Sequence, residues 1–372
     1  MTTPTTLNRD QVVSLLGEIQ DPELHRGLNE LHMVRNLSVE GPKVAVTIAL
    51  TVPNSASRPY YLEVIPAKIR NAFPHAKVDV DFVVLSEDER LALSESMRKD
   101  SPSPMAGSDS KTQVIAIGSG KGGVGKSTTA VNLATSLAKG GYSVGLLDAD
   151  VWGFSVPRML GIYEKPSVLG DLIVPPEMFG VKVVSIGLFT SEENPVMWRG
   201  PMLHKALQQF LEDVHWGDPD YLLLDLPPGT GDVAMSIAQF IPGAAMITVT
   251  TPQAVAEKVA QRAAFMAEKT GLKPTGVIEN MSYFTCEHGT RYELFGRGGG
   301  ETLAQRLRVP LMGQIPMDPM LMEFADKGAP IVLQAPDSAV AQAYDLCAKE
   351  LVNLIQPKPK AKKRISLPLG GK

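Results

Sequence analysis

The sequence predicts an α/β protein in which a mainly parallel sheet, covered by helices, follows a small N-terminal α/β domain. Two observations favour this fold class. From residue 111 to about 356, short continuous apolar runs alternate with segments of helical spacing, which is typical of parallel strands buried on both faces. Before that region lies a shorter series of helical and strand-like patterns. The chain of 372 residues is long enough to bury two cores.

The order of these patterns defines the expected elements. In the N-terminal region we expect helices at 9–19 and 60–73, and strands at 34–39, 44–50 and 78–85. In the larger region the expected strands are 114–117, 144–147, 181–186, 221–224, 245–250, 276–278 and 311–315. Ligands of such sheets bind at the carboxyl ends of the strands, so we expect the functional site there.

Composition divides the chain into four parts. We expect a small α/β domain at 1–90, a Ser- and Pro-rich linker at 91–111, a larger domain at 112–356 and a basic tail at 357–372. The tail holds six positive residues and no acidic ones, so without it the formal net charge of −4 becomes −10. We expect the tail to be disordered, either as a solubilising segment or as a contact for nucleic acid or anionic lipid.

The overall composition indicates a soluble protein. Hydrophobic residues make up 44% of the chain and charged residues 20%, and the mean hydropathy is near zero. The first residues have neither the basic nor the apolar part of a secretion signal, and no apolar run is long enough to span a membrane. Two cysteines cannot form a disulfide framework. We therefore expect a cytoplasmic protein with no membrane partner.

The strongest motif is a phosphate-binding loop of the pattern G-x-x-x-x-G-K-S/T, placed between an expected strand and an expected helix. Its glycines let successive N–H groups and the helix N-terminus converge on phosphate oxygens. Lys126 is expected to reach the β and γ phosphates, and the Ser127 hydroxyl to bind Mg²⁺. The nucleotide-binding residues are Gly120, Lys121, Gly122, Gly123, Val124, Gly125, Lys126, Ser127 and Thr128.

Lys121 is a second lysine at the front of this loop. Since Lys126 already serves the γ phosphate of its own subunit, we predict that Lys121 acts across a subunit boundary; the alternative is a solvated surface lysine. In this respect the loop resembles that of the deviant Walker A ATPases, the group of ParA, MinD and the nitrogenase iron protein. The resemblance implies a homodimer in which the equivalent lysine contacts ATP bound to the opposite subunit.

Further candidate residues follow other strands. Asp225 ends the apolar run 221–224 in the Walker B layout and is expected to support Mg²⁺ through water, while Asp148 or Asp150 orients the attacking water or the metal. Strand-end aspartates also commonly cap a following helix. The segment 227–232 resembles a switch that senses the γ phosphate, and Asn280 resembles the asparagine that reads adenine in related ATPases.

Five sequence phrases together resemble the Mrp/ApbC family over nearly the whole chain. They are VMWRGPMLHKAL at 196–207, DLPPGTGD at 225–232, TTPQ at 250–253, ENMS at 279–282 and FGRGGG at 295–300. The resemblance implies a P-loop NTPase fold with an iron–sulfur-assembly-type domain in front. It also implies an ATP-hydrolysing homodimer that transfers a 4Fe–4S cluster to apo iron–sulfur proteins, in the company of assembly factors.

The chain departs from the family at its thiols. The family binds its cluster through a C-x-x-C pair, whereas this chain has Cys286 followed by Gly289, with His288 as the nearest substitute ligand. In the front domain Ser55 occupies the position of a family cysteine. One alternative is therefore a nucleotide-driven protein switch or loading factor without its own cluster, with Cys286 a spare thiol and His288 a turn residue. A weaker alternative is a positioning ATPase that acts on membrane or DNA. The other cysteine, Cys347, lies in a segment of helical spacing and is expected to be a core residue rather than a ligand.

Overall fold

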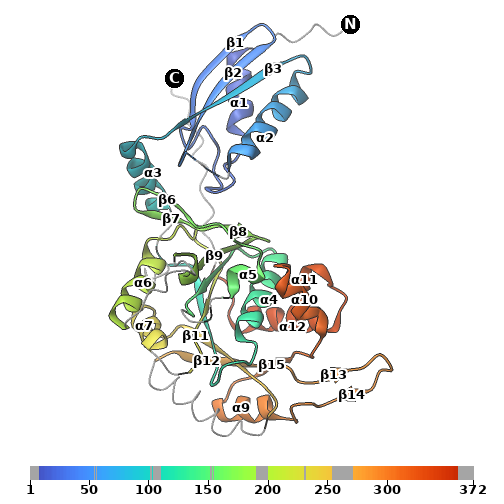
Figure 1. Cartoon of the computed structure of the whole chain (residues 1–372). Coiled ribbons are helices and arrows are strands. Elements are labelled where there is room, and N and C mark those ends of the chain that lie inside the picture. The colour runs from blue at the N-terminus through green and yellow to red at the C-terminus, as the bar shows by residue number, and fades with distance from the viewer. Residues whose placement is uncertain are drawn as a thin grey trace, which may run out of the picture. The chain divides into compact units, whose positions relative to one another are not determined.

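The computed structural model describes residues 8–53, 55, 57–100, 103, 110–150, 153, 155–189, 200–229, 232–253 and 271–358. They form two compact units (Figure 1). The first unit comprises residues 1–101, 164–177 and 213–216, and the second comprises the remainder. Most of the basic tail and residues 196–199 of the phrase at 196–207 lie outside the described residues.

The first unit contains a three-stranded sheet with α1 and α2 on one face (Figure 1). The strand order is β1-β2-β3; β1 and β2 are antiparallel, whereas β2 and β3 run parallel. The Asn8 and Gln11 side chains cap the start of α1 reciprocally. The elements are α1 (Arg9–Gly17), β1 (Val34–Glu40), β2 (Lys43–Leu50), α2 (Ser57–Ala72), β3 (Lys77–Val84) and α3 (Glu87–Asp100). Each strand and helix expected up to residue 85 is therefore present.

A hairpin from later in the chain completes the first unit. It consists of β6 (Ser167–Leu169) and β7 (Leu172–Val174), and Leu169, Leu172 and Val174 join the same apolar core as α1, α2 and β2. Arg98 on α3 bonds to this region through Asp171 and through Asp213, 2.9 Å from its Nη2 atom. A helix thus occupies residues 87–100, where composition alone indicated the start of a linker.

The second unit contains an eight-stranded sheet in the order β15-β12-β11-β4-β10-β5-β9-β8. The strand pairs from β15 to β9 are all parallel, which confirms the predicted fold class. Each of the strands expected there is present. The strands are β4 (Gln113–Gly118), β5 (Val144–Asp148), β8 (Glu177–Met178), β9 (Val181–Ser185), β10 (Tyr221–Asp225), β11 (Ala245–Thr250), β12 (Lys273–Glu279) and β15 (Leu311–Gln314).

Helices cover both faces of this sheet, with α4 and α12 on one face and α6 and α7 on the other (Figure 1). The core between α4, α12 and the central strands includes Val131, Leu223, Tyr344 and Cys347. Cys347 is fully buried, as its helical spacing predicted, and burial raises the pKa of its thiol to about 12. The helices are α4 (Lys126–Lys139), α5 (Val156–Met159), α6 (Gly200–Glu212), α7 (Asp232–Phe240), α9 (Gly299–Leu307), α10 (Pro319–Asp326), α11 (Ile331–Gln334) and α12 (Ala339–Leu354).

A short hairpin, β13 (Phe284–Thr285) with β14 (Arg291–Tyr292), leaves the sheet after β12 and carries Cys286 in its turn. It projects from the body of the second unit (Figure 1). Across the described part of the chain, no helix combines the length and the apolar character that crossing a membrane requires.

Candidate functional site

The loop between β4 and α4 has the backbone that its glycines permit. Gly123 and Gly125 adopt positive φ values of 75° and 77°, and Gly125 is the residue that precedes the first turn of α4. A Cβ on Gly125 would lie 2.2 Å from Nδ2 of Asn280, so a side chain is excluded there by contact as well as by conformation. The free N–H groups at the start of α4 face the end of the sheet where a phosphate would bind.

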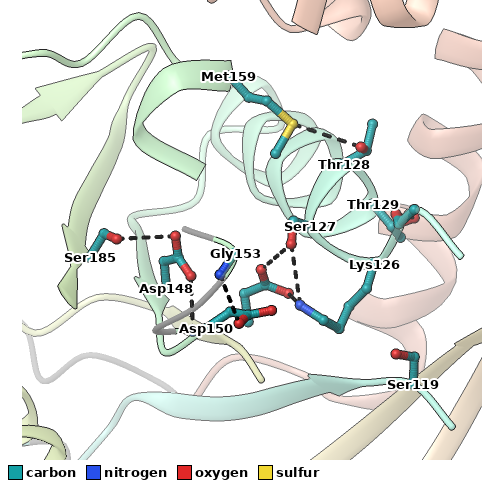
Figure 2. A network of polar contacts seen from close by, with 12 residues as sticks. Ser119, Lys126, Ser127, Thr128, Thr129, Asp148, Asp150, Gly153, Met159 and Ser185 are labelled. Atoms are coloured by element: carbon teal, nitrogen blue, oxygen red, sulfur yellow. Dashed lines mark hydrogen bonds and ion pairs between the residues drawn. The ribbon is translucent and has the colours of Figure 1, made fainter. Parts of the chain in front are cut away.

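Lys126 and Ser127 converge on Asp225 at the end of β10 (Figure 2). Lys126 Nζ lies 2.5 Å from Asp225 Oδ1, and Ser127 Oγ donates to Asp225 Oδ2 at 2.5 Å. Lys126 is only 6% exposed and Asp225 is fully buried. Burial raises the pKa of Asp225, and the lysine charge and the two hydrogen bonds oppose that rise. The aspartate therefore compensates the buried lysine charge.

Asp148 ends the neighbouring strand, β5, and Asp150 follows it. Asp148 Oδ1 accepts the Asp150 N–H at 3.1 Å, and its Oδ2 lies 3.1 Å from the Ser185 hydroxyl on β9 (Figure 2). Burial, and then the charge of Asp225, raise the pKa of Asp148. Asp150 is more open and accepts the Gly153 N–H. The two residues differ accordingly: Asp148 is a desolvated carboxyl, whereas Asp150 is the accessible one.

The donor set suits Mg²⁺. The Ser127 hydroxyl and the Asp225 carboxylate are already in contact, and the Asp150 charge also acts on Asp225. Hydroxyl and carboxylate oxygens are the ligands that this hard cation prefers, and the excess of carboxylates over the lysine provides the charge it needs. Ser127 would bind the ion directly and Asp225 would hold it through water; the ion would neutralise charge on the transferring phosphoryl group.

The segment after β10 lies against the front of the phosphate loop. The Leu226 N–H donates to Ile117 O and the Gly229 N–H donates to Ser119 O, both at 3.0 Å. A Cβ on Gly122 would touch Pro228. Of the expected switch, Gly229 thus bonds through its backbone to the residue just before the loop, while 230 and 231 are outside the described residues.

Lys121 is bonded within its own chain. Its Nζ donates to Gln253 Oε1 at 2.6 Å, and its backbone carbonyl accepts the Ser119 hydroxyl at 2.9 Å. The sequence had indicated a contact across a subunit boundary, and Gln253 was not anticipated as a partner. Lys121 must leave Gln253 before it can reach a second subunit, so the predicted role stays a prediction.

Asn280, which follows β12, holds the backbone of the phosphate loop. It is 3% exposed, its Nδ2 donates to Val124 O at 2.9 Å, and its own N–H donates to Thr250 O. These contacts link the end of β12 to the phosphate loop. Reading of adenine by Asn280 also stays a prediction, since the contact that the structure shows is to the loop backbone.

The turn of the β13–β14 hairpin presents Cys286. The Cys286 N–H donates to Thr290 O, and Gly289 has a φ of 80° and donates its N–H to Cys286 O. Backbone hydrogen bonds from His288 and Thr290 lower the pKa of the Cys286 thiol, which favours the thiolate that binds metal. The His288 side chain is exposed. Over the described ranges, no three His, Cys, Asp or Glu side chains gather closely enough to bind a metal ion.

The first unit contains a second polar cluster, around Glu23. The Ser57 hydroxyl donates to Glu23 Oε1 at 3.0 Å and the Ser55 hydroxyl does so at 3.3 Å. Asp21, which is buried, accepts the Tyr61 hydroxyl. Burial, and then the charge of Asp21, raise the pKa of Glu23. Ser55, singled out by resemblance, therefore lies against a carboxylate that sequence reasoning missed.

Comparison with known proteins matches both parts of the chain to family models. Residues 110–352 match the model described as NUBPL iron-transfer P-loop NTPase, and residues 9–81 match the model described as iron-sulfur cluster assembly protein. The chain belongs to the iron-transfer P-loop NTPase family. The family resemblance indicated by the five phrases is confirmed.

Relatives of this family resemble the chain over almost its full length. A protein of Mycobacterium leprae named iron-sulfur cluster carrier protein is 47% identical over 344 residues, which cover 90% of each chain. One of the same name from Synechocystis is 40% identical over 356 residues, covering 94% of this chain and 98% of the relative.

Two solved structures share the nucleotide-binding fold. The Archaeoglobus fulgidus nucleotide-binding protein in complex with ADP has a TM-score of 0.52 at 36% identity, and the match covers 63% of this chain and 91% of that one. The Pyrococcus horikoshii septum site-determining protein MinD with Mg-ADP has a TM-score of 0.51 at 26% identity, covering 67% and 100%. A P-loop NTPase fold is thereby confirmed for the second unit.

Proposed function

We propose that this P-loop NTPase is a cytoplasmic homodimer that binds and hydrolyses ATP and transfers iron–sulfur clusters to apo-proteins. The convergence of Lys126, Ser127 and Asp225 at the end of a parallel strand is the observation that carries the ATPase part. Relatives named iron-sulfur cluster carrier protein at 40–48% identity support the cargo. Apo iron–sulfur proteins and assembly factors are the proposed partners.

Nucleotide binding would exchange the anion that compensates Lys126, from the Asp225 carboxylate to a phosphate. The γ phosphate would take Asp225's place as the partner of Lys126, and Asp225 would then be free to hold Mg²⁺ through water. Because the lysine charge stays compensated throughout, the exchange avoids leaving an unpaired buried cation. Asp150 follows β5 and is more accessible than Asp148 at the end of that strand; it would orient the attacking water, while Asp148 fixes the Asp150 backbone.

Closure of the dimer would recruit Lys121. In the single chain its ammonium is bonded to a neutral amide, Gln253 Oε1, at 2.6 Å. A triphosphate on the opposite subunit offers a charged acceptor, and charge-assisted hydrogen bonds are roughly twice as strong as neutral ones. ATP in the partner subunit therefore favours the closed dimer, and hydrolysis with loss of the γ phosphate weakens it.

The proposed cargo site is the turn of the β13–β14 hairpin. Asn280, which holds the phosphate loop, lies six residues before Cys286 on the same continuous segment. Each protomer supplies one thiolate there, so a dimer supplies two of the four that 4Fe–4S clusters usually take. His288 or thiolates of the receiving protein would complete the set, which suits a cluster that is held briefly and passed on.

Anaerobic reconstitution with iron and sulfide tests the cargo. We expect the purified full chain to acquire the thiolate-to-iron absorption near about 400 nm that is typical of such clusters. Cys286→Ser should remove this band, because it removes the thiolate that each protomer supplies. Cys347→Ala is the matched control: that thiol is fully buried, and the variant should retain the band.

The second candidate keeps the ATPase and omits the cluster. Gly289 in place of a second thiol, and Ser55 hydrogen-bonded to Glu23, favour a nucleotide-driven loading factor that acts on a cluster held by another protein. A full chain that hydrolyses ATP but binds no iron after reconstitution would support this candidate over the carrier. Loss of ATP hydrolysis in Lys126→Ala is expected for both.

A further inference from the structure

The free edge of β3 and the side of α2 form a groove on the first unit. Two adjoining hollows of about 470 and 270 Å³ follow β3, and both are lined by Leu62 of α2 and Val80 of β3. The first is also lined by Arg70 and Asp79, and the second by Arg58, Asp81 and Val84. Because β3 is an outer strand of its sheet (Figure 1), the floor of the groove includes backbone N–H and C=O groups that no neighbouring strand pairs.

Apolar side chains are unusually open along this groove. Leu62 is 49% exposed, Val83 44% and Val84 43%. Val78, Val80 and Phe82, on the face of β3 toward α2, are only partly buried. Exposed apolar side chains beside an unpaired strand edge are the features by which extended peptides are bound as an added strand.

The opposite face of β3 begins with Lys77 and then carries two carboxylates. Asp79 and Asp81 alternate with the apolar residues and are exposed. In the described part of the chain neither carboxylate takes part in an ion pair or a side-chain hydrogen bond. A strand added to this edge would place its own side chains about 5 Å from these carboxylates, where opposite charges attract and like charges repel.

We propose that this groove binds an extended segment of a partner protein as a fourth strand, with apolar residues toward α2 alternating with Lys or Arg beside Asp79 and Asp81. The backbone edge supplies affinity, the hollows at Leu62 select the apolar side chains, and the two carboxylates select the basic ones. None of the residues of this surface belongs to the nucleotide site or to the turn that carries Cys286.

A second copy of the chain fits this edge less well. If two β3 strands paired about Val80, Asp79 of one copy would lie opposite Asp81 of the other. A parallel pair in register would place each aspartate opposite its own equivalent. Like charges directly opposite one another destabilise a sheet in both of these arrangements. Pairing about Val78 would place Lys77 opposite Asp79 instead, but only residues 77–79 of the two strands would overlap.

The test uses two fluorescent peptides as long as β3, one of alternating Val and Lys and one of alternating Val and Glu. Fluorescence anisotropy with the full chain should show the Val/Lys peptide binding at least about fivefold more tightly. Asp79→Lys/Asp81→Lys should reverse the preference between the two peptides, and Leu62→Glu should weaken the binding of both. Amide exchange should slow along β3 when the Val/Lys peptide binds.

The reversed preference also controls for folding, because an unfolded variant would not gain affinity for the second peptide. Asp326→Lys/Asp337→Lys changes two other exposed carboxylates by the same charge and should leave the preference unchanged. Absence of Val/Lys binding, or the same preference in the Asp79→Lys/Asp81→Lys variant, would overturn the proposal. Protection of β3 by self-association of the peptide-free chain would assign the edge to a second copy instead, which also overturns it.

Discussion

Replacement of Asp225 by asparagine isolates the ion pair that the nucleotide-free site depends on. Lys126 is 6% exposed, and its Nζ lies 2.5 Å from Asp225 Oδ1. Removal of one partner of a buried pair leaves an uncompensated charge and typically costs about 3–5 kcal/mol. Part of that cost is offset here. Burial raises the pKa of Asp225, because the ionised carboxylate loses its hydration, and the neutral amide of asparagine does not carry this desolvation cost. We therefore expect Asp225→Asn to lower the free energy of unfolding by about 3 kcal/mol.

Asp148→Asn is the matched control. Asp148 is equally buried and lies on the adjacent strand, but within the described residues it has no lysine bonded to it, and burial and then the charge of the Asp225 carboxylate raise its pKa. A neutral amide relieves that repulsion, so the change in stability should stay within about 1 kcal/mol. The two isosteric substitutions should thus differ clearly, although both remove one carboxylate from the same site.

Thermal unfolding of the nucleotide-free proteins measures the difference. A loss of about 3 kcal/mol corresponds to a Tm lower by about 6–12 °C for a unit of this size. ATP without Mg²⁺ should bind Asp225→Asn at least as tightly as wild type, because the phosphate no longer competes with a carboxylate for Lys126. Equal Tm values for Asp225→Asn and wild type, or equal losses in the two variants, would refute the reasoning.

Three further predictions concern Asn280, Lys121 and Glu23. Asn280→Ala should weaken GTP binding as well as ATP binding, since its amide holds the loop backbone; an unchanged GTP affinity would contradict this, and a larger loss for ATP would support the reading of adenine. In sedimentation with ATP, Lys121→Ala should reduce dimerisation, while Gln253→Ala, which frees the lysine, should preserve or increase it; unchanged profiles in both would exclude the cross-subunit role. Burial raises the pKa of Glu23, so its ionised form opposes folding at neutral pH and this penalty disappears as pH falls toward about 4. Glu23→Gln should accordingly raise Tm at pH 7 and not at pH 4, and the opposite pH trend would show that the ionised form is stabilised.

The nucleotide site could be predicted from the sequence because its residues are local to strand ends. The apolar run 221–224 forms a buried parallel strand, so Asp225 lies at the carboxyl end of that strand. Gly123 and Gly125 permit the positive φ values that the loop adopts. The parallel sheet could likewise be predicted, because strands that alternate with helices along the chain are typical of parallel sheets.

Contacts between distant residues could not be predicted in this way. Lys121 and Gln253 are 132 residues apart, and neither belongs to a spacing pattern that pairs them. The strands at 167–169 and 172–174 are too short to give a periodic signal, and their partners are residues of the first unit. Glu23 lies in an ordinary polar stretch, and only the folded chain places it against Ser55 and Ser57.

The β6–β7 hairpin has a practical consequence for anyone who shortens this protein. The polypeptide crosses between the two units five times, so no single cut separates them. A fragment ending near residue 101 would lack Leu169, Leu172 and Val174 from its core. A fragment beginning near residue 110 would retain these three side chains without the residues that cover them, and would be prone to aggregate. Truncation experiments on the front unit are therefore best made with the hairpin grafted onto it, or replaced by a polar loop in the remainder.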